Sequence, residues 1–218
     1  MKPQTMNSGT CLAVLKDEEG YLYFASDRRG SWGFGKAHKL EDPKSRFRSG
    51  VLMMGTGGCF EIVEMLDHMK IAPFTSKTNP DMYMHNKFIP AVVRHFKSQG
   101  LLHPKERRLR HHDDSEWIGA VMVVGLGSSV YEVTVDNLHI VFNKVGSPWA
   151  HGCGGALAWG SLLTTEAFGK MEEEKLEVSI PDRLALALSV AATVSPGCDD
   201  NIDIISNKPG FEPMYIGV

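Results

Sequence analysis

One threonine near the start of the chain has the neighbours that a nucleophile in acyl transfer would need. Thr10 follows Gly9 and opens an apolar segment, in the run SGTCLAV at residues 8–14. A hydroxyl group is a weak nucleophile near neutral pH, so an adjacent base must accept its proton. A free α-amine, with an ordinary pKa of about 7.7–8.0, could be that base within the same residue. Taken alone, Thr10 is more typical of an ordinary strand, where threonine is common.

Other residues that could support such chemistry follow within the first 60 positions. Asp27 ends an apolar segment, in the run FASDRR at residues 24–29, and the glycine-rich run GTGG occupies residues 55–58. Three lysines stand between these two features, namely Lys36, Lys39 and Lys44. Each has a simpler interpretation: the aspartate caps a turn, the glycines permit a tight turn with positive φ, and the lysines are solvated. A catalytic interpretation therefore needs the elements that would bring these residues together.

Apolar patterns indicate those elements. Two short apolar segments, 10–15 and 21–26, flank the polar run DEEG and predict a β-hairpin. Residues 28–43 predict an irregular stretch, and 51–54 predict a strand that runs into the glycine turn. Helical spacing predicts helices at 59–69 and 88–96, separated by a loop that contains Pro73 and Pro80. The charged segment 101–115 predicts a solvent-exposed loop.

The second half of the chain continues with strands, then helices, then strands. The predicted strands are 117–124, 130–135, 139–143, 202–206 and 214–217, with a turn at 125–128. The run GCGG opens a predicted helix at 152–169, and Pro181 marks the first turn of the last helix. Runs of each element type, rather than strict alternation, favour a layered α+β fold with antiparallel sheets.

Composition excludes several classes of protein. The chain has 218 residues, of which 43% are hydrophobic, and a formal net charge of −3. A nucleic-acid-binding protein usually shows a basic excess, and the basic run at 105–112 is followed by two aspartates. No apolar run is long enough for a membrane span, and the start of the chain lacks a secretory signal. Four dispersed cysteines and histidines without ligand spacing predict reduced thiols in the cytoplasm, with no metal or cofactor.

Together these motifs resemble the β-type subunits of the proteasome family, from Thr10 to nearly the end of the chain. The resemblance implies a four-layer αββα sandwich of the N-terminal-nucleophile hydrolase type. It also implies that residues 1–9 are a propeptide and that 10–218 form a single domain. The activity implied is that of a threonine-type endopeptidase, which cuts unfolded peptides through an acyl-enzyme on Thr10. The partners implied are further copies of the chain in a ring and a separate unfolding ATPase.

The resemblance also assigns roles to individual residues. Asp27 would orient the catalytic lysine, which family spacing identifies best as Lys44, with Lys39 and then Lys36 as alternatives. The ammonium group would lower the pKa of the reacting groups, and an amide of Gly57 or Gly58 would bind the oxyanion.

Three positions depart from the family pattern. Cys153 replaces a supporting serine, and Ser195 stands where an aspartate belongs; Cys198 stands where a second serine belongs. Asp199 or Asp200 could substitute if the turn shifts. These departures leave open an alternative, a catalytically silent subunit with a structural or interaction role. A small-molecule amidase that uses the same kind of nucleophile is a third interpretation.

Overall fold

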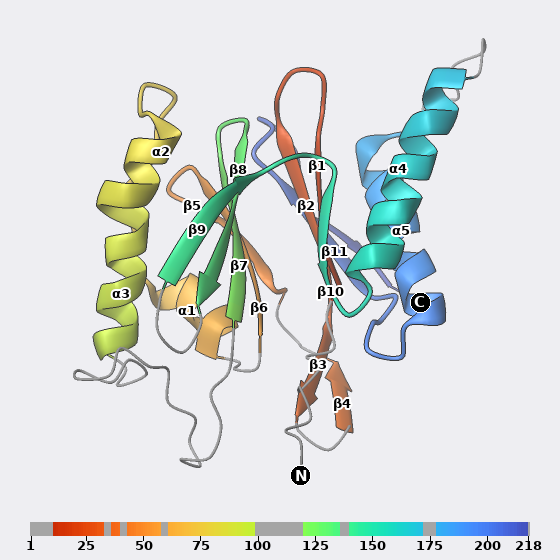
Figure 1. The fold of residues 1–218 in the computed structure, drawn as a ribbon, viewed down its shortest axis with the longest axis horizontal. Helices are drawn as coiled ribbons and strands as arrows, with labels where there is room; N and C mark the ends of the chain where they lie inside the picture. The colour runs from red at the N-terminus through yellow and green to blue at the C-terminus, as the bar shows by residue number, and fades with distance from the viewer. Residues whose placement is uncertain are drawn as a thin grey trace. The chain divides into compact units, whose positions relative to one another are not determined.

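The chain forms two compact units in the computed structural model. The structure describes residues 11–32, 36–39, 43–57, 61–98, 120–135, 140–171 and 178–217. One unit comprises Met1–Ser45 with Gly146–Val218, and the other comprises Arg46–Val145. Each unit contains its own five-stranded sheet with helices against it (Figure 1). Among the helices of the described ranges, none has the length and apolar character needed to cross a membrane.

The first unit is built on the strand that follows Thr10. Its sheet has the order β10 (Trp149–Gly152), β1 (Cys11–Lys16), β2 (Leu22–Asp27), β11 (Ile202–Ser206) and β12 (Met214–Ile216). All four pairings are antiparallel. Helices α4 (Gly155–Met171) and α5 (Ile180–Val194) pack together and against this sheet (Figure 1). Their buried side chains and those of the sheet form one apolar core.

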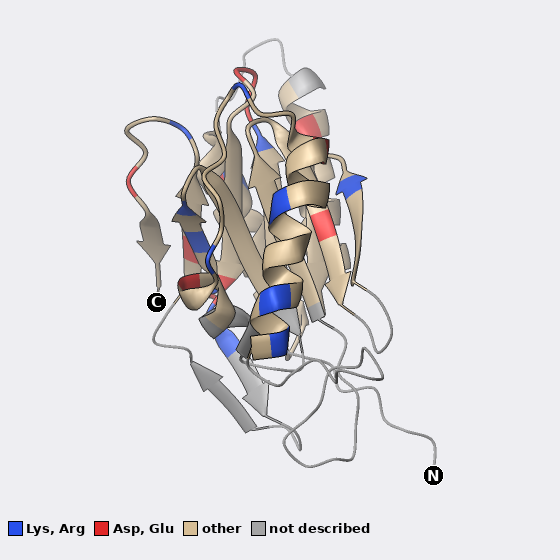
Figure 2. Cartoon of the chain, turned by 90° about the vertical axis from the view of Figure 1, so that its left-hand side faces the viewer, with Lys and Arg blue, Asp and Glu red and all other residues tan. Residues whose placement is uncertain are grey.

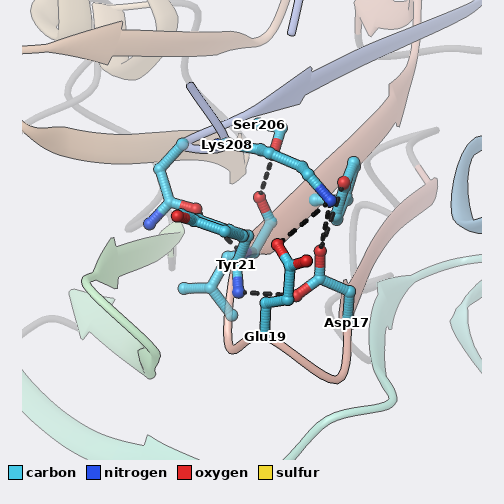
Figure 3. Close-up of polar contacts among 8 residues, drawn as sticks. Asp17, Glu19, Tyr21, Ser206 and Lys208 are labelled. Atoms are coloured by element: carbon cyan, nitrogen blue, oxygen red, sulfur yellow. Dashed lines mark hydrogen bonds and ion pairs between the residues drawn. The ribbon is translucent and has the colours of Figure 1, made fainter. Parts of the chain in front are cut away.

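The predicted hairpin of β1 and β2 is confirmed, and polar contacts fix its turn. The backbone N–H of Tyr21 donates to Asp17 Oδ1 at 2.8 Å, and Lys208 Nζ lies 3.3 Å from Asp17 Oδ2. Glu19 Oε2 lies 3.3 Å from the same ammonium group (Figure 3). The turn is thereby tied to Lys208, just beyond β11. At the end of β11, Ser206 Oγ donates to the Leu22 carbonyl at 2.8 Å.

The second unit has the sheet order β5 (Ser45–Arg48), β6 (Val51–Gly57), β7 (Ala120–Leu126), β8 (Ser129–Val135) and β9 (Ile140–Val145). Helix α1 (Glu61–His68) and the continuous helical run α2 (Pro80–Tyr83), η1 (Met84–Phe88) and α3 (Ile89–Ser98) cover one face of it (Figure 1). The last turn of α3 carries His95 and Lys97, and Figure 2 shows basic residues at this end. Positive charge there interacts favourably with the C-terminal end of the helix dipole.

The predicted order of elements needs correction at three places. Residues 28–43 are not wholly irregular: β3 (Arg29–Trp32) pairs with β4 (Lys36–Lys39) as a separate antiparallel ribbon. The strand β10 was not predicted; it contains only four residues and ends in the glycine of the GCGG run. Helix α4 therefore begins at Gly155, after a turn, and not at residue 152.

Three further boundaries differ from the prediction for local reasons. Pro80 begins a helix, because the side chain of Asn79 caps it by accepting from the Met82 N–H at 3.0 Å. Residues 55–57 continue β6, paired with residues 120–122, and do not form the predicted turn. Glycine weakens a strand, but the ladder to β7 supplies the hydrogen bonds. The turn after β7 is likewise shorter than predicted, because residues 125 and 126 pair with β8.

Candidate active site

A buried ion pair joins Asp27, at the end of β2, to Lys44. Asp27 is the last residue of β2, and Lys44 lies just before β5. Lys44 Nζ donates to Asp27 Oδ1 at 2.5 Å, and the two residues are 2% and 0% exposed, respectively. Neither charge would be stable in an apolar interior without the other. Among the described residues, Oδ2 of Asp27 has no hydrogen-bond partner, so the carboxylate can accept a further donor.

The carboxyl group of Asp27 responds to three neighbours as well as to burial. Burial raises its pKa from the usual value to about 6, although the Lys44 ammonium and the Cys11 backbone N–H lower it. A thiolate on Cys153 would raise it, which indicates that this sulfur lies within electrostatic range of the carboxylate. Cys11 begins β1, and its nitrogen is bonded to Thr10, which lies outside the described residues.

Three cysteine thiols meet beside this ion pair. The Sγ atoms of Cys153 and Cys198 are 3.4 Å apart, and a hydrogen bond also joins the Cys198 and Cys11 thiols. A Cβ added to Gly154 would lie 2.5 Å from Cys198 Sγ and 3.3 Å from Cys11 Sγ, so only glycine leaves room for these thiols. No disulfide joins any two of the three. The hydrogen bond from Cys11, ahead of burial, raises the pKa of Cys198 to about 11.

Ser195 approaches the same cluster from the end of α5. It is the C-cap of that helix, and its N–H donates to the Ala191 carbonyl at 2.8 Å. The Cys198 N–H donates back to the Ser195 carbonyl at 3.0 Å, and a side-chain hydrogen bond from Ser195 lowers the pKa of Cys198. Asp199 Oδ1 accepts from the N–H and the amide nitrogen of Asn201, at 2.6 and 2.7 Å. The carboxylate of Asp199 thus stabilises its own turn.

Two arginines that the sequence analysis left without a role hold this turn in place. The Arg28 guanidinium donates twice to Asp203, at 2.7 Å each, and lies 4.3 Å from the centroid of the Tyr215 ring. Arg29 Nη1 donates to the Cys198 carbonyl at 3.3 Å. Their only sequence signal is that they directly follow Asp27. The arginines thus position the chain around Cys198.

The other predicted site residues either belong to strands of the structure or lie outside the described residues. Gly57 ends β6, in the second unit, and Gly58 lies outside the described residues, as does Thr10. Lys36 and Lys39 both belong to β4. The structure therefore brings together Asp27, Lys44, Cys153 and Ser195 of the predicted set, with Cys11 and Cys198 added.

This arrangement can bind a proton donor or tune a neighbouring nucleophile. It offers a buried carboxylate with one unused oxygen, a fixed ammonium group and several thiol and hydroxyl donors. In the described part of the chain, no three histidine, cysteine or acidic side chains are arranged to hold a metal ion. A carboxylate, an ammonium group, thiols and a hydroxyl can serve as acids, bases and nucleophiles.

Comparison with known proteins shows the fold. The sequence matches no protein-family model and no curated protein. Structures of Thiobacillus denitrificans BPH, one of them in complex with epoxomicin, are similar with a TM-score of 0.58 and 14% identity. The likeness to the epoxomicin complex covers 90% of this chain and 97% of that one. HslV from Trypanosoma brucei is similar with a TM-score of 0.56 and 14% identity, over 90% of this chain and 98% of that one. The predicted α+β class with antiparallel sheets is confirmed, and the fold is similar to the folds of BPH and HslV.

Proposed function

We propose that the chain is a threonine-type endopeptidase subunit that uses Thr10 as its nucleophile after residues 1–9 are removed. One observation carries the proposal: a buried Lys44–Asp27 ion pair that contacts the N–H of Cys11, the residue next to Thr10. Burying two charges in a small protein is unfavourable unless they are paired, and such pairs with perturbed pKa values are concentrated at functional sites. The likeness in fold to HslV supports the same proposal.

The proposed reaction needs few groups. The α-amine of Thr10 accepts the proton of its own hydroxyl, and Oγ1 attacks the peptide carbonyl. The Lys44 ammonium favours the deprotonated hydroxyl, and Asp27 keeps that ammonium charged and oriented. A backbone amide of Gly57 or Gly58 donates to the oxyanion, an interaction whose loss lowers rates by about 10²–10³. The C–N bond then breaks, the proton passes to the leaving amine, and water hydrolyses the ester.

Cys153 and Ser195 are proposed as supporting residues around the amine of Thr10. Their side chains differ from those that the family pattern predicts, and Cys153 lies against a sulfur. This substitution favours the second candidate, a catalytically silent subunit with a structural or interaction role. For the active form we propose unfolded peptides as substrates, a homo-oligomeric ring, a separate unfolding ATPase and a cytoplasmic location.

The test combines intact mass with turnover. The purified chain should lose residues 1–9, begin at Thr10 on N-terminal sequencing, and hydrolyse fluorogenic peptides in preference to simple amides. Thr10→Ala should abolish turnover and leave the unfolding midpoint unchanged, whereas Thr164→Ala, at an exposed position of α4, should retain both. Epoxomicin, which the Thiobacillus denitrificans protein binds, should bind wild type and not Thr10→Ala.

Three results separate the candidates. Turnover retained by Thr10→Ala would refute the assignment of Thr10 as the nucleophile. A folded, full-length chain without turnover supports the silent subunit, and preference for simple amides supports an amidase. Lys44→Ala should be inactive and Lys39→Ala active; the reverse result would reassign the lysine.

A further inference from the structure

We propose that Cys153 and Cys198 form a reversible disulfide when the protein meets a peroxide. Their sulfurs lie 3.4 Å apart although 45 positions separate them in the sequence. Cys153 is exposed, whereas Cys198 is only 4% exposed. Cys153 can therefore react with an oxidant from solvent, and the Cys198 sulfur is already in contact with the Cys153 sulfur. This inference does not depend on the proposed peptidase activity.

The backbone around both residues permits the bond to close. Cys153 lies in the turn between β10 and α4, and Cys198 lies in the turn after α5. A disulfide has an S–S length of about 2.05 Å, so the sulfurs must approach by about 1.4 Å. Small side-chain rotations and shifts of the two turns can supply this movement, because neither residue belongs to a sheet ladder or a helix.

Cys11 is a poorer partner although it also contacts Cys198. It belongs to β1, which is an inner strand between β10 and β2, and its Cα is paired with that of Gly152. Its side chain is fully buried, so a peroxide cannot reach it without an opening of the sheet. The surroundings therefore favour the Cys153–Cys198 pair over either pair that includes Cys11.

The chemistry proceeds in two balanced steps. The Cys153 thiol reacts with hydrogen peroxide, giving a sulfenic acid and one water. The Cys198 sulfur then attacks the Cys153 sulfur, the S–S bond forms, and the sulfenic oxygen leaves as a second water. Two electrons pass from the two thiols to the peroxide. A dithiol such as dithiothreitol reverses the change by exchange and becomes a cyclic disulfide.

The roles of the two sulfurs follow from their environments. The thiolate is the attacking form, and the raised pKa of Cys198 leaves little thiolate near neutral pH. The closing step should therefore be slow enough at pH 7 for the sulfenic acid to be trapped, and it should accelerate as pH rises toward 9. Dimedone, which reacts with sulfenic acids, should compete with disulfide formation at the lower pH.

The test is mass spectrometry of the full chain after peroxide treatment and alkylation with N-ethylmaleimide. The four cysteines fall in four tryptic peptides, and the pair of interest occupies residues 145–170 and 184–218. The expected product is these two peptides joined, with the loss of two hydrogen atoms, and dithiothreitol should separate them. Cys198→Ala should accumulate the dimedone adduct on Cys153 and form no cross-link. Cys59→Ser, the matched control, should leave the cross-link unchanged.

Each other result contradicts the proposal. A cross-link to the peptide that contains Cys11, disulfides only between two chains, or over-oxidised Cys153 without any cross-link would each exclude it. Cys153→Ser is an exposed substitution that should not disturb folding, and a Cys198 cross-link that persists in this variant would have the same meaning. These readouts need no enzymatic turnover, so they remain decisive if the proposed peptidase activity fails.

Discussion

The Lys44–Asp27 pair predicts a pH-dependent loss of stability when the lysine is replaced. Lys44→Met keeps most of the aliphatic side chain and removes the charge that faces Asp27. Breaking a buried ion pair typically destabilises a protein by about 3–5 kcal/mol, because one charge is left unpaired. In this variant the carboxyl group of Asp27 can bind a proton and become neutral, and this limits the loss in free energy of unfolding.

The limit can be worked from the pKa of Asp27, which burial raises to about 6. In wild type the free energy needed to protonate this group is on the order of 1 kcal/mol at pH 7, on the order of 3 kcal/mol at pH 8 and almost zero at pH 5. The charge lost in Lys44→Met cannot destabilise the fold by more than these amounts. The difference from wild type should therefore grow with pH, by about 1.4 kcal/mol per unit above pH 6.

The sign for wild type itself follows from the same pKa. The folded value lies above the ordinary value of about 3.9, so the native state binds more protons between roughly pH 4 and pH 6. The contribution of Asp27 to the free energy of unfolding thus decreases as pH rises through that window. Asp27→Asn should remove this decrease.

The assay is urea unfolding of wild type and Lys44→Met at pH 5, 7 and 8, followed by tryptophan fluorescence. Lys208→Met is the matched control, since its ammonium pairs with Asp17 and Glu19 at a solvent-exposed turn (Figure 3). Its difference from wild type should be small and should not grow with pH. A Lys44→Met difference that is independent of pH, or that shrinks as pH rises, would refute the assigned coupling.

Three further predictions concern the first unit. Gly154→Ala should destabilise the fold by about 1–3 kcal/mol in urea unfolding, because its Cβ would meet Cys198 Sγ at 2.5 Å; Gly155→Ala, whose nearest contact is 3.4 Å, should change little. Ser179→Ala should lower the free energy of unfolding by about 1 kcal/mol, because its side chain caps α5; an unchanged midpoint would show that the cap contributes nothing. If the proposed peptidase activity holds, turnover should fall as pH drops through about 6, when Asp27 becomes protonated; a rate that stays constant from pH 5 to 7 would contradict this.

Local chemistry explains which elements the sequence predicted. The hairpin of β1 and β2 has apolar strands around a polar turn, and α5 begins with a capping serine before a proline, so each carries its own signal. The ribbon of β3 and β4 consists mainly of polar and small residues, so its sequence lacks the apolar alternation that would predict two strands. Helix α2 was missed because a proline read as a loop marker is also favoured in a first helical turn.

Site residues could be predicted from the sequence only where they stand at a characteristic spacing from a recognisable motif. Asp27 ends a strand, and Lys44 follows it at a spacing that the family resemblance supplied. The contact between Cys153 and Cys198 has no such signal, since it depends on the turn before α4 meeting the turn after α5. The anchoring of that second turn by Arg28 and Arg29 depends equally on tertiary structure.

The small strand β12 has a practical consequence for handling the protein. Its Tyr215 ring lies over the Arg28 guanidinium, and its hydroxyl donates to Asn201 Oδ1 at 2.6 Å. Removing the last five residues would strip this aromatic cover and admit water to the Arg28–Asp203 pair. A C-terminal expression tag should therefore be separated from Tyr215 by a flexible spacer, so that the ring stays packed on the Arg28 guanidinium.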